Sequence, residues 1–153
     1  MKETSAGVII YRRTKEGPKF LLLYHGGRYW NFPKGKIEES GGRETAFRAA
    51  LREVKEETGL SSHDLRLNNR FKSYDNYTFT KQGKKVFKTV IYYLAETNKK
   101  EIKISEEHSG WAWFLYRDAL RFLIYGNLKN NLRRAYETVR GKSLRRRKEN
   151  PAG

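Results

Sequence analysis

The sequence Arg-Glu-Val-Lys-Glu-Glu-Thr-Gly-Leu at residues 52–60 ends the clearest helix in the chain, which we predict over residues 45–58. Thr45 is a suitable N-cap, because its hydroxyl can accept a hydrogen bond from a free backbone N–H of the first turn. Gly59 follows the last turn, where glycine commonly ends a helix. One stripe of this helix is expected to face the hydrophobic core: Phe47, Ala50, Leu51, Val54 and Thr58.

Three glutamates, Glu53, Glu56 and Glu57, gather on another face of the same helix, because positions i, i+3 and i+4 are neighbours. Their mutual repulsion disappears if a divalent cation binds among them. The chain has no cysteine, and ligands that are all carboxylates favour Mg²⁺ or Mn²⁺ over zinc. The alternative is a solvated helix face on which the glutamates pair with neighbouring basic side chains: Arg48, Arg52 and Lys55.

Residues 52–60 resemble the second half of the Nudix box, Arg-Glu-apolar-x-Glu-Glu-x-Gly-apolar, at every position. Glu44 lies eight residues before Arg52, which is the spacing of the earlier glutamate of the box. The resemblance implies an α+β fold, a Nudix-type sandwich with a central mixed β-sheet flanked by helices. It implies an enzyme that hydrolyses a nucleoside diphosphate linked to another group. It also implies that Glu53, Glu56 and Glu57 bind metal, that Glu57 acts in catalysis, and that Arg52 and Glu44 orient the acidic cluster.

The glycine that opens the box departs from the family pattern. Gly35 stands nine residues before Glu44 rather than six, so residues 36–43 contain three extra residues. The family's metal contact from this glycine would fall on the carbonyl of Gly35. The insertion leaves that contact and the path of the loop open, but it does not alter the acidic helix.

Three further segments, at residues 30–36, 88–96 and 104–108, resemble asymmetrical diadenosine tetraphosphate hydrolases. This resemblance implies that Glu107 is a further metal ligand and a candidate base. It implies substrate contacts from the following residues: Lys34, Lys88, His108, Tyr77 and Tyr125. The two tyrosines would hold an adenine between their rings. From the residues alone, Lys88 could equally point to solvent, His108 could be a hydrogen-bonded loop histidine, and the tyrosines could be half-buried core residues.

The rest of the chain reads as strands before and after the central helix, followed by two helical stretches that Gly126 separates. The predicted strands cover residues 5–13, 19–25, 29–32, 64–73, 86–95 and 111–115. Residues 34–44 are expected to form a loop, and residues 117–140 the C-terminal helices. We therefore predict one domain over residues 1–140, followed by a basic, flexible tail at residues 141–153.

The charge is unusually positive, with 33 Lys and Arg against 17 Asp and Glu, or +16 net. Such a surplus favours polyanionic partners, although a basic surface can also serve solubility alone. It favours contact with RNA through the basic surface and tail, so an RNA 5′-pyrophosphohydrolase is one alternative to the dinucleotide hydrolase. A non-catalytic RNA-binding module with the same fold is another. No apolar run is long enough to cross a membrane and the start does not resemble a signal peptide, so we expect a cytoplasmic protein.

Overall fold

The computed structural model of the chain describes residues 1–26, 28–38 and 44–149, with side chains as far as residue 141. Its centre is an eight-stranded sheet with the order β3-β2-β1-β7-β5. Strand β4 pairs with β1, β6 with β7, and β8 with β2. The strands are β1 (Lys2–Thr14), β2 (Gly17–His25), β3 (Tyr29–Asn31), β4 (Lys34–Lys36), β5 (Arg66–Leu67), β6 (Ser73–Lys81), β7 (Lys84–Glu96) and β8 (Gly110–Leu115).

The sheet is mixed, as the resemblance implied, because β1 and β7 run parallel whereas the other pairs are antiparallel. In the register of the parallel pair, Ser5 lies opposite Val90 and Ile9 opposite Leu94. Strand β1 lies at the centre of the sheet and is apolar on both faces, which is typical of a strand covered by helices on both sides. The sheet therefore needs a helical layer on each face.

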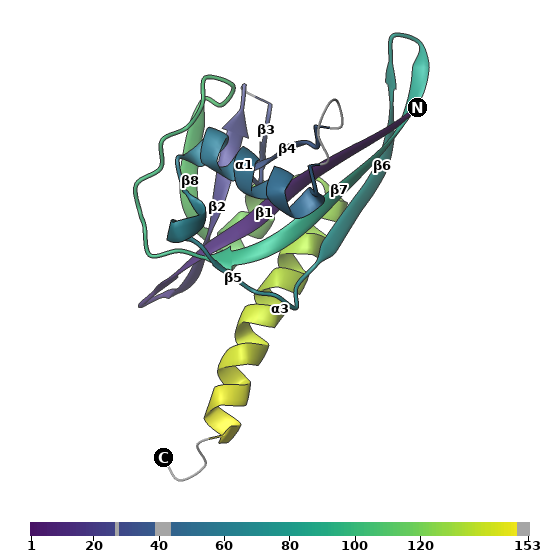
Figure 1. The fold of residues 1–153 in the computed structure, drawn as a ribbon. Coiled ribbons are helices and arrows are strands. Elements are labelled where there is room, and N and C mark those ends of the chain that lie inside the picture. Colours follow the sequence, from purple (N-terminus) through teal and green to yellow (C-terminus); the bar gives the residue numbers. More distant parts are fainter. Residues whose placement is uncertain (27, 39–43, 150–153) are drawn as a thin grey trace.

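Helix α1 (Ala46–Thr58) covers one face of the sheet, and α2 (Tyr116–Phe122) and α3 (Gly126–Glu149) pack on the other, as Figure 1 shows. A short 3-10 helix, η1 (Ser62–Asp64), follows α1. Alternate residues of β1 divide between the two cores: Val8 and Ile10 lie on the α1 side, and Ile9 and Tyr11 on the α3 side. The α+β sandwich predicted from the resemblance is confirmed.

Two local predictions are wrong: the strand at residues 64–73 and the loop that was expected to begin at residue 34. Residues 64–73 do not form one strand: they contain the end of η1, the two-residue β5 and a loop, and β6 begins only at Ser73. Strand β6 was missed because Ser73 and Asp75, which the sheet buries, are polar and hide the alternation. Residues 34–36 form β4 against β1 rather than loop.

Helix α1 agrees with the prediction apart from one core residue. Phe47 is 39% exposed and packs edge-on against Tyr93, with 5.3 Å between ring centroids. Ala49, which was not predicted to be in the core, is completely buried. Small residues bring the helix close to the sheet, and the larger phenyl ring stays at the edge of the contact.

The C-terminal helices begin at Tyr116, next to the predicted start at residue 117, and they are interrupted immediately before Gly126. Helix α3 continues to Glu149 and so crosses the predicted boundary between domain and tail at residue 140. The flexibility of residues 141–153 stays a prediction. Within the described part of the chain, no helix is long and apolar enough to span a bilayer, and the predicted cytoplasmic location also stays a prediction.

Candidate active site

Helix α1 begins and ends with the two capping residues expected from the sequence. The Thr45 hydroxyl accepts a hydrogen bond from Arg48 N at 3.2 Å, and Gly59 adopts the left-handed conformation with φ of 79°. These caps set where the helix begins and ends, and packing against the sheet decides which of its faces is buried. Consequently Glu57 turns inward and is only 5% exposed, whereas the side chain of Glu56 is 55% exposed.

Arg52 connects the acidic helix to the residues around it. Its Nε and Nη2 donate to the two carboxylate oxygens of Glu44, at 2.7 and 2.9 Å. Its Nη1 donates to Glu53 at 2.9 Å and to Glu56 at 3.3 Å, and Nη2 also donates to the carbonyl of Lys36 at 2.9 Å. A planar guanidinium with five donors can make this set of contacts, whereas an ammonium group cannot.

The Glu44 carboxylate contacts the backbone of the insertion that separates Glu44 from Gly35. Its Oε1 accepts a hydrogen bond from Glu38 N at 2.9 Å, so the two ends of the inserted stretch meet at this carboxylate. The Arg52 guanidinium lowers the pKa of Glu44 to about 2, which keeps the carboxylate charged. Residues 39–43 of the insertion lie outside the described residues.

Gly35 lies directly beside the acidic face of α1. A Cβ placed on Gly35 would overlap the carboxylate of Glu53, so no other residue fits there without moving Glu53. The neighbouring Lys34 N donates to Oε2 of Glu57 at 3.1 Å. Strand β4 and helix α1 therefore approach each other at their backbones, and the three-residue insertion does not disturb this approach.

A cavity of about 330 Å³ opens between β4, α1 and the segment before β8. Its lining contains all five predicted metal-binding residues, which are Gly35, Glu53, Glu56, Glu57 and Glu107, together with Lys34, Lys36 and Ser105. Among the described residues, no three carboxylate or imidazole groups already converge into a ligand set. Two of the four glutamates, Glu53 and Glu56, are instead held by Arg52.

The carboxylates of this cavity are electrostatically strained. Burial above all, with added contributions from the charges of Glu53 and Glu107, raises the pKa of Glu57 to about 8, although the hydrogen bond from Lys34 N opposes this shift. Burial also raises the pKa of Glu53, and Glu56 and Glu107 add to that effect. A set of oxygen donors with excess negative charge fits a hard divalent cation, which would relieve the repulsion.

His108 lies beside Glu57, which lines the acidic cavity. Its Nε2 is 4.0 Å from Oε2 of Glu57 and 3.1 Å from Nε2 of His25, and its Nδ1 is 3.3 Å from the Ser105 hydroxyl. Burial lowers the pKa of His108 and, together with the charge of His108, lowers that of His25 to about 4. Sequence reasoning missed His25, because nothing in β2 connects it with the segment that carries His108.

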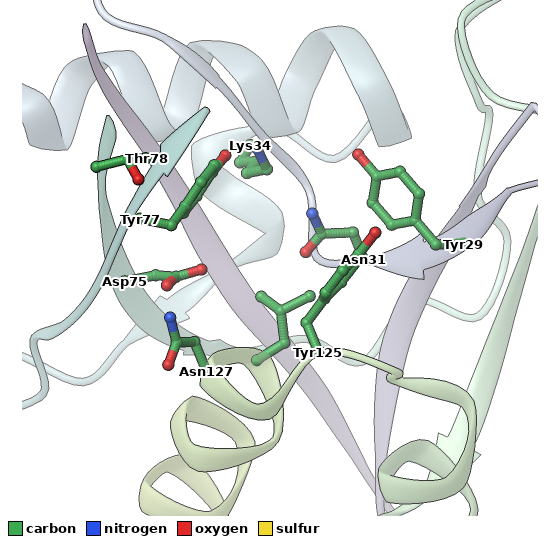
Figure 2. Close-up of a pocket in the computed structure, with 9 residues that line it drawn as sticks. Tyr29, Asn31, Lys34, Asp75, Tyr77, Thr78, Tyr125 and Asn127 are labelled. Carbon is green, nitrogen blue, oxygen red and sulfur yellow. The ribbon is translucent and has the colours of Figure 1, made fainter. Parts of the chain in front are cut away.

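A second cavity, of about 410 Å³, lies between β6 and the start of α3. Tyr77 and Tyr125 stand on opposite sides of it in Figure 2, so the structure brings the two predicted stacking residues to one pocket. The lining residues are Tyr29, Asn31, Lys34, Asp75, Tyr77, Thr78, Tyr125, Asn127 and Leu128. Lys34 belongs to both cavities and therefore joins them.

Lys88, like His108, is a predicted substrate residue that lines neither cavity in the described part of the chain. Its side chain is only 7% exposed, and its Nζ lies 3.4 Å from Oε2 of Glu3 on β1. Lys36 and Lys81 also pair with Glu3, at 2.9 and 4.0 Å, so this glutamate contacts three lysines. Burial lowers the pKa of Lys88, and the Glu3 carboxylate opposes that shift.

A model of the NUDIX domain family matches residues 1–137, and the chain therefore belongs to this family. It is a Nudix hydrolase, a class of enzymes that act on nucleoside polyphosphates and generally use divalent metal ions.

Its similarity extends to one group of these enzymes. The asymmetrical bis(5′-nucleosyl)-tetraphosphatase of Caenorhabditis elegans is 30% identical over 133 residues, covering 85% of this chain and 91% of that protein. The crystal structure of a binary complex of the C. elegans Ap4A hydrolase matches with a TM-score of 0.78 and 29% identity. That match covers 91% of this chain and 98% of the other. An RNA pyrophosphohydrolase from Hydrogenovibrio crunogenus is 32% identical over 127 residues, covering 73% of each protein.

Proposed function

We propose that this Nudix hydrolase cleaves dinucleoside tetraphosphates asymmetrically, converting diadenosine tetraphosphate into ATP and AMP with Mg²⁺ or Mn²⁺. The observation that carries the proposal is the pair of cavities joined at Lys34, one acidic and one lined by tyrosines. A dinucleotide with a polyphosphate chain needs both a place for a base and a place for metal-bound phosphates. The relatives named as asymmetrical tetraphosphatases support the same substrate.

In this proposal the acidic cavity binds the cation, and the tyrosine-lined cavity binds a base. Glu53, Glu56, Glu57 and Glu107, with the backbone of Gly35, would hold the cation. The cation, when bound, would neutralise phosphate charge and make water more acidic. Glu107 would serve as the candidate base, and Glu44 would keep Arg52 in position.

The proposed substrate contacts follow from the position of Lys34, which lines both cavities. Lys34 reaches both cavities, so it would bind the phosphate chain where it passes between them. Tyr77 and Tyr125 would stack on one base, and this would determine which phosphorus faces the acidic cavity. His108 lies beside Glu57 and would help to position it, whereas Lys88 would act on phosphate only after leaving Glu3.

The regiochemistry of cleavage tests the proposal. Diadenosine tetraphosphate incubated with the enzyme and Mg²⁺ should give AMP and ATP in equal amounts by anion-exchange chromatography. The paired change Tyr77→Ala and Tyr125→Ala should raise KM at least about thirtyfold, because two stacking contacts are lost and each is worth about 1–3 kcal/mol. Tyr74→Ala is the matched control, since Tyr74 lies on the same strand, is 50% exposed and does not line the pocket. Two molecules of ADP as the main product would refute the proposal.

Removal of pyrophosphate from RNA 5′ ends is a second candidate. The similarity to an RNA pyrophosphohydrolase and the net charge of +16 favour it, because RNA offers many more phosphates than a dinucleotide does. A comparison of kcat/KM for 5′-triphosphorylated RNA and for diadenosine tetraphosphate discriminates between the two substrates. The proposed assignment requires a clear preference for the dinucleotide.

A further inference from the structure

Asp75 is an unusual residue to find in the wall of the tyrosine-lined pocket. It is only 6% exposed, and within the described part of the chain its Oδ1 is buried without a hydrogen-bond partner. A buried, unsatisfied carboxylate oxygen destabilises a fold, so its presence at a pocket indicates that a ligand donates to it. Asp75 is thus a candidate for recognising the base itself.

The surroundings of Asp75 place it at one edge of a flat ligand. Asp75 and Tyr77 point to the same side of β6, because they are two residues apart. Tyr125 stands on the opposite wall, and Asn127 follows it in the first turn of α3. Figure 2 shows Asp75 and Asn127 next to each other at one end of the pocket, with the two tyrosine rings facing across it. A base held between the rings would therefore present an edge to Asp75 and Asn127.

The charge state of Asp75 decides which hydrogen-bonding edge of a base it can bind. Burial raises the pKa of Asp75, whereas the Asn127 amide and the positive charge of Lys34 lower it. Lys34 lines the same pocket and so favours the ionised carboxylate. An ionised carboxylate has only acceptors, so it pairs best with two adjacent donors.

Among the common bases only guanine offers two adjacent donors, its N1–H and its 2-amino group. Adenine and cytosine place one amino group beside a ring acceptor, and uracil has one N–H between two carbonyls. We propose that Asp75, assisted by the exposed Asn127, selects guanine as the clamped base, so that diguanosine tetraphosphate is preferred to diadenosine tetraphosphate. The preference for a dinucleotide rests on the proposed function, but the selection of guanine can be measured without catalysis.

Binding of mononucleotides to the unaltered, metal-free protein is the first test. Isothermal titration calorimetry should show GMP binding about tenfold to hundredfold more tightly than AMP, the ratio that one bidentate pair supplies. IMP keeps N1–H but lacks the 2-amino group, so its affinity should fall between the two. Equal affinities for GMP and AMP would overturn the inference. Tighter binding of AMP would do so too, because it would indicate a protonated Asp75 that pairs with adenine.

Variants then test whether Asp75 causes the preference for GMP over AMP. Asp75→Asn keeps the size of the side chain and replaces an acceptor with a donor, so the ratio of GMP to AMP affinity should fall at least about tenfold. Asp118→Asn, on α2 and outside the pocket, is the control and should leave the ratio unchanged. Because Asp75 is buried, Asn127→Ala provides a second variant at an exposed position, with a smaller fall in the same direction.

The outcomes separate this inference from the proposed function. A protein that cleaves both dinucleotides equally and keeps its GMP to AMP ratio in Asp75→Asn would refute guanine selection while leaving the hydrolase assignment intact. If the protein cleaves neither dinucleotide but Asp75→Asn abolishes a preference for GMP, guanine selection is supported and the proposed hydrolysis of dinucleotides is refuted. Support for both requires kcat/KM for diguanosine tetraphosphate to exceed that for diadenosine tetraphosphate by a factor similar to the binding ratio.

Discussion

Glu57 combines the deepest burial of the helix glutamates with the most strongly raised pKa in the acidic cavity. Changing Glu57→Gln should lower kcat by about a hundredfold to a thousandfold, the loss typical for one electrostatic group at an active site. Without metal, the same change should raise the melting temperature by about 2–4 °C, which corresponds to roughly 1 kcal/mol in a domain of this size. The physical reason is that a buried carboxylate beside Glu53 and Glu107 is replaced by a neutral amide.

The control for this prediction is Glu56→Gln. Its side chain is 55% exposed and pairs with Arg52, so the change should lower activity without raising the melting temperature. Steady-state kinetics at saturating Mg²⁺ and thermal unfolding in a chelator measure the two effects. Near-normal turnover by Glu57→Gln would show that the acidic cavity is not the catalytic centre.

Gly35 leaves no space for a side chain beside Glu53, and a single substitution tests whether this close approach matters for activity. A methyl group in Gly35→Ala would overlap the Glu53 carboxylate and push it out of the cavity. We expect kcat to fall at least about tenfold and the Mg²⁺ concentration for half-maximal activity to rise. Gly110→Ala is the matched control, because its added Cβ would be 3.7 Å from Tyr24 Cβ, an ordinary contact. Unchanged Mg²⁺ dependence in Gly35→Ala would mean that Glu53 does not contribute to metal binding.

At the scale of elements, Arg52 holds helix α1, strand β4 and the end of the insertion together. Arg52→Lys keeps the charge but cannot make paired hydrogen bonds to Glu44 while also contacting Glu53. Activity should therefore fall about tenfold to hundredfold through loss of orientation, with a smaller effect on stability. Arg48→Lys, on the exposed side of the same helix, is the control. A fully active Arg52→Lys enzyme would show that charge alone is sufficient at this position.

Strand β6 and helix α3 together form the wall of the tyrosine-lined pocket that carries Asp75 and Asn127. The buried side of β6 carries Ser73, Asp75 and then Tyr77, and α3 places Asn131 and Arg134 against Ser73. Polar residues inside a core oppose simple patterning and are commonly retained for function. This pair of elements therefore lines the tyrosine-lined pocket with residues that contribute little to hydrophobic burial.

At the scale of the whole molecule, the excess of positive charge extends along α3 into the C-terminal segment. Residues 140–148 contain six basic residues and no acidic one: Arg140, Lys142, Arg145, Arg146, Arg147 and Lys148. Such a run favours phosphate chains and releases counterions when it binds them. We predict that it anchors RNA and does not take part in dinucleotide hydrolysis.

Truncation after residue 141 tests this prediction while keeping Val139 in the core and Arg140 over the Tyr136 ring. RNA affinity should fall, and its dependence on salt should become less steep, because fewer phosphates are neutralised. The kcat/KM for diadenosine tetraphosphate should remain unchanged. Filter binding over a range of salt concentrations and anion-exchange assays provide the two measurements. A large loss of dinucleotide turnover would place the segment at the active site instead.

The sequence by itself determined the acidic helix, its two caps and the class of enzyme. Local physics suffices for the helix and its caps, and the spacing of Glu53, Glu56 and Glu57 places them on one face of any helix. The pattern of residues 52–60 and Glu44 was enough to identify the family, and β7 was evident from its long β-branched and aromatic run. Phe47 was assigned wrongly because a helical wheel does not show where the sheet ends.

Only the tertiary structure decided which distant residues share a cavity. Strand β6 brings Asp75 to Asn127, and β2 brings His25 to His108, although 83 residues separate the two histidines. Contacts of this kind depend on strand pairing and helix packing across the whole chain, so no local pattern indicates them. Burial, too, is a tertiary property: the unpaired oxygen of Asp75 and the raised pKa of Glu57 exist only because the folded sheet excludes water from them.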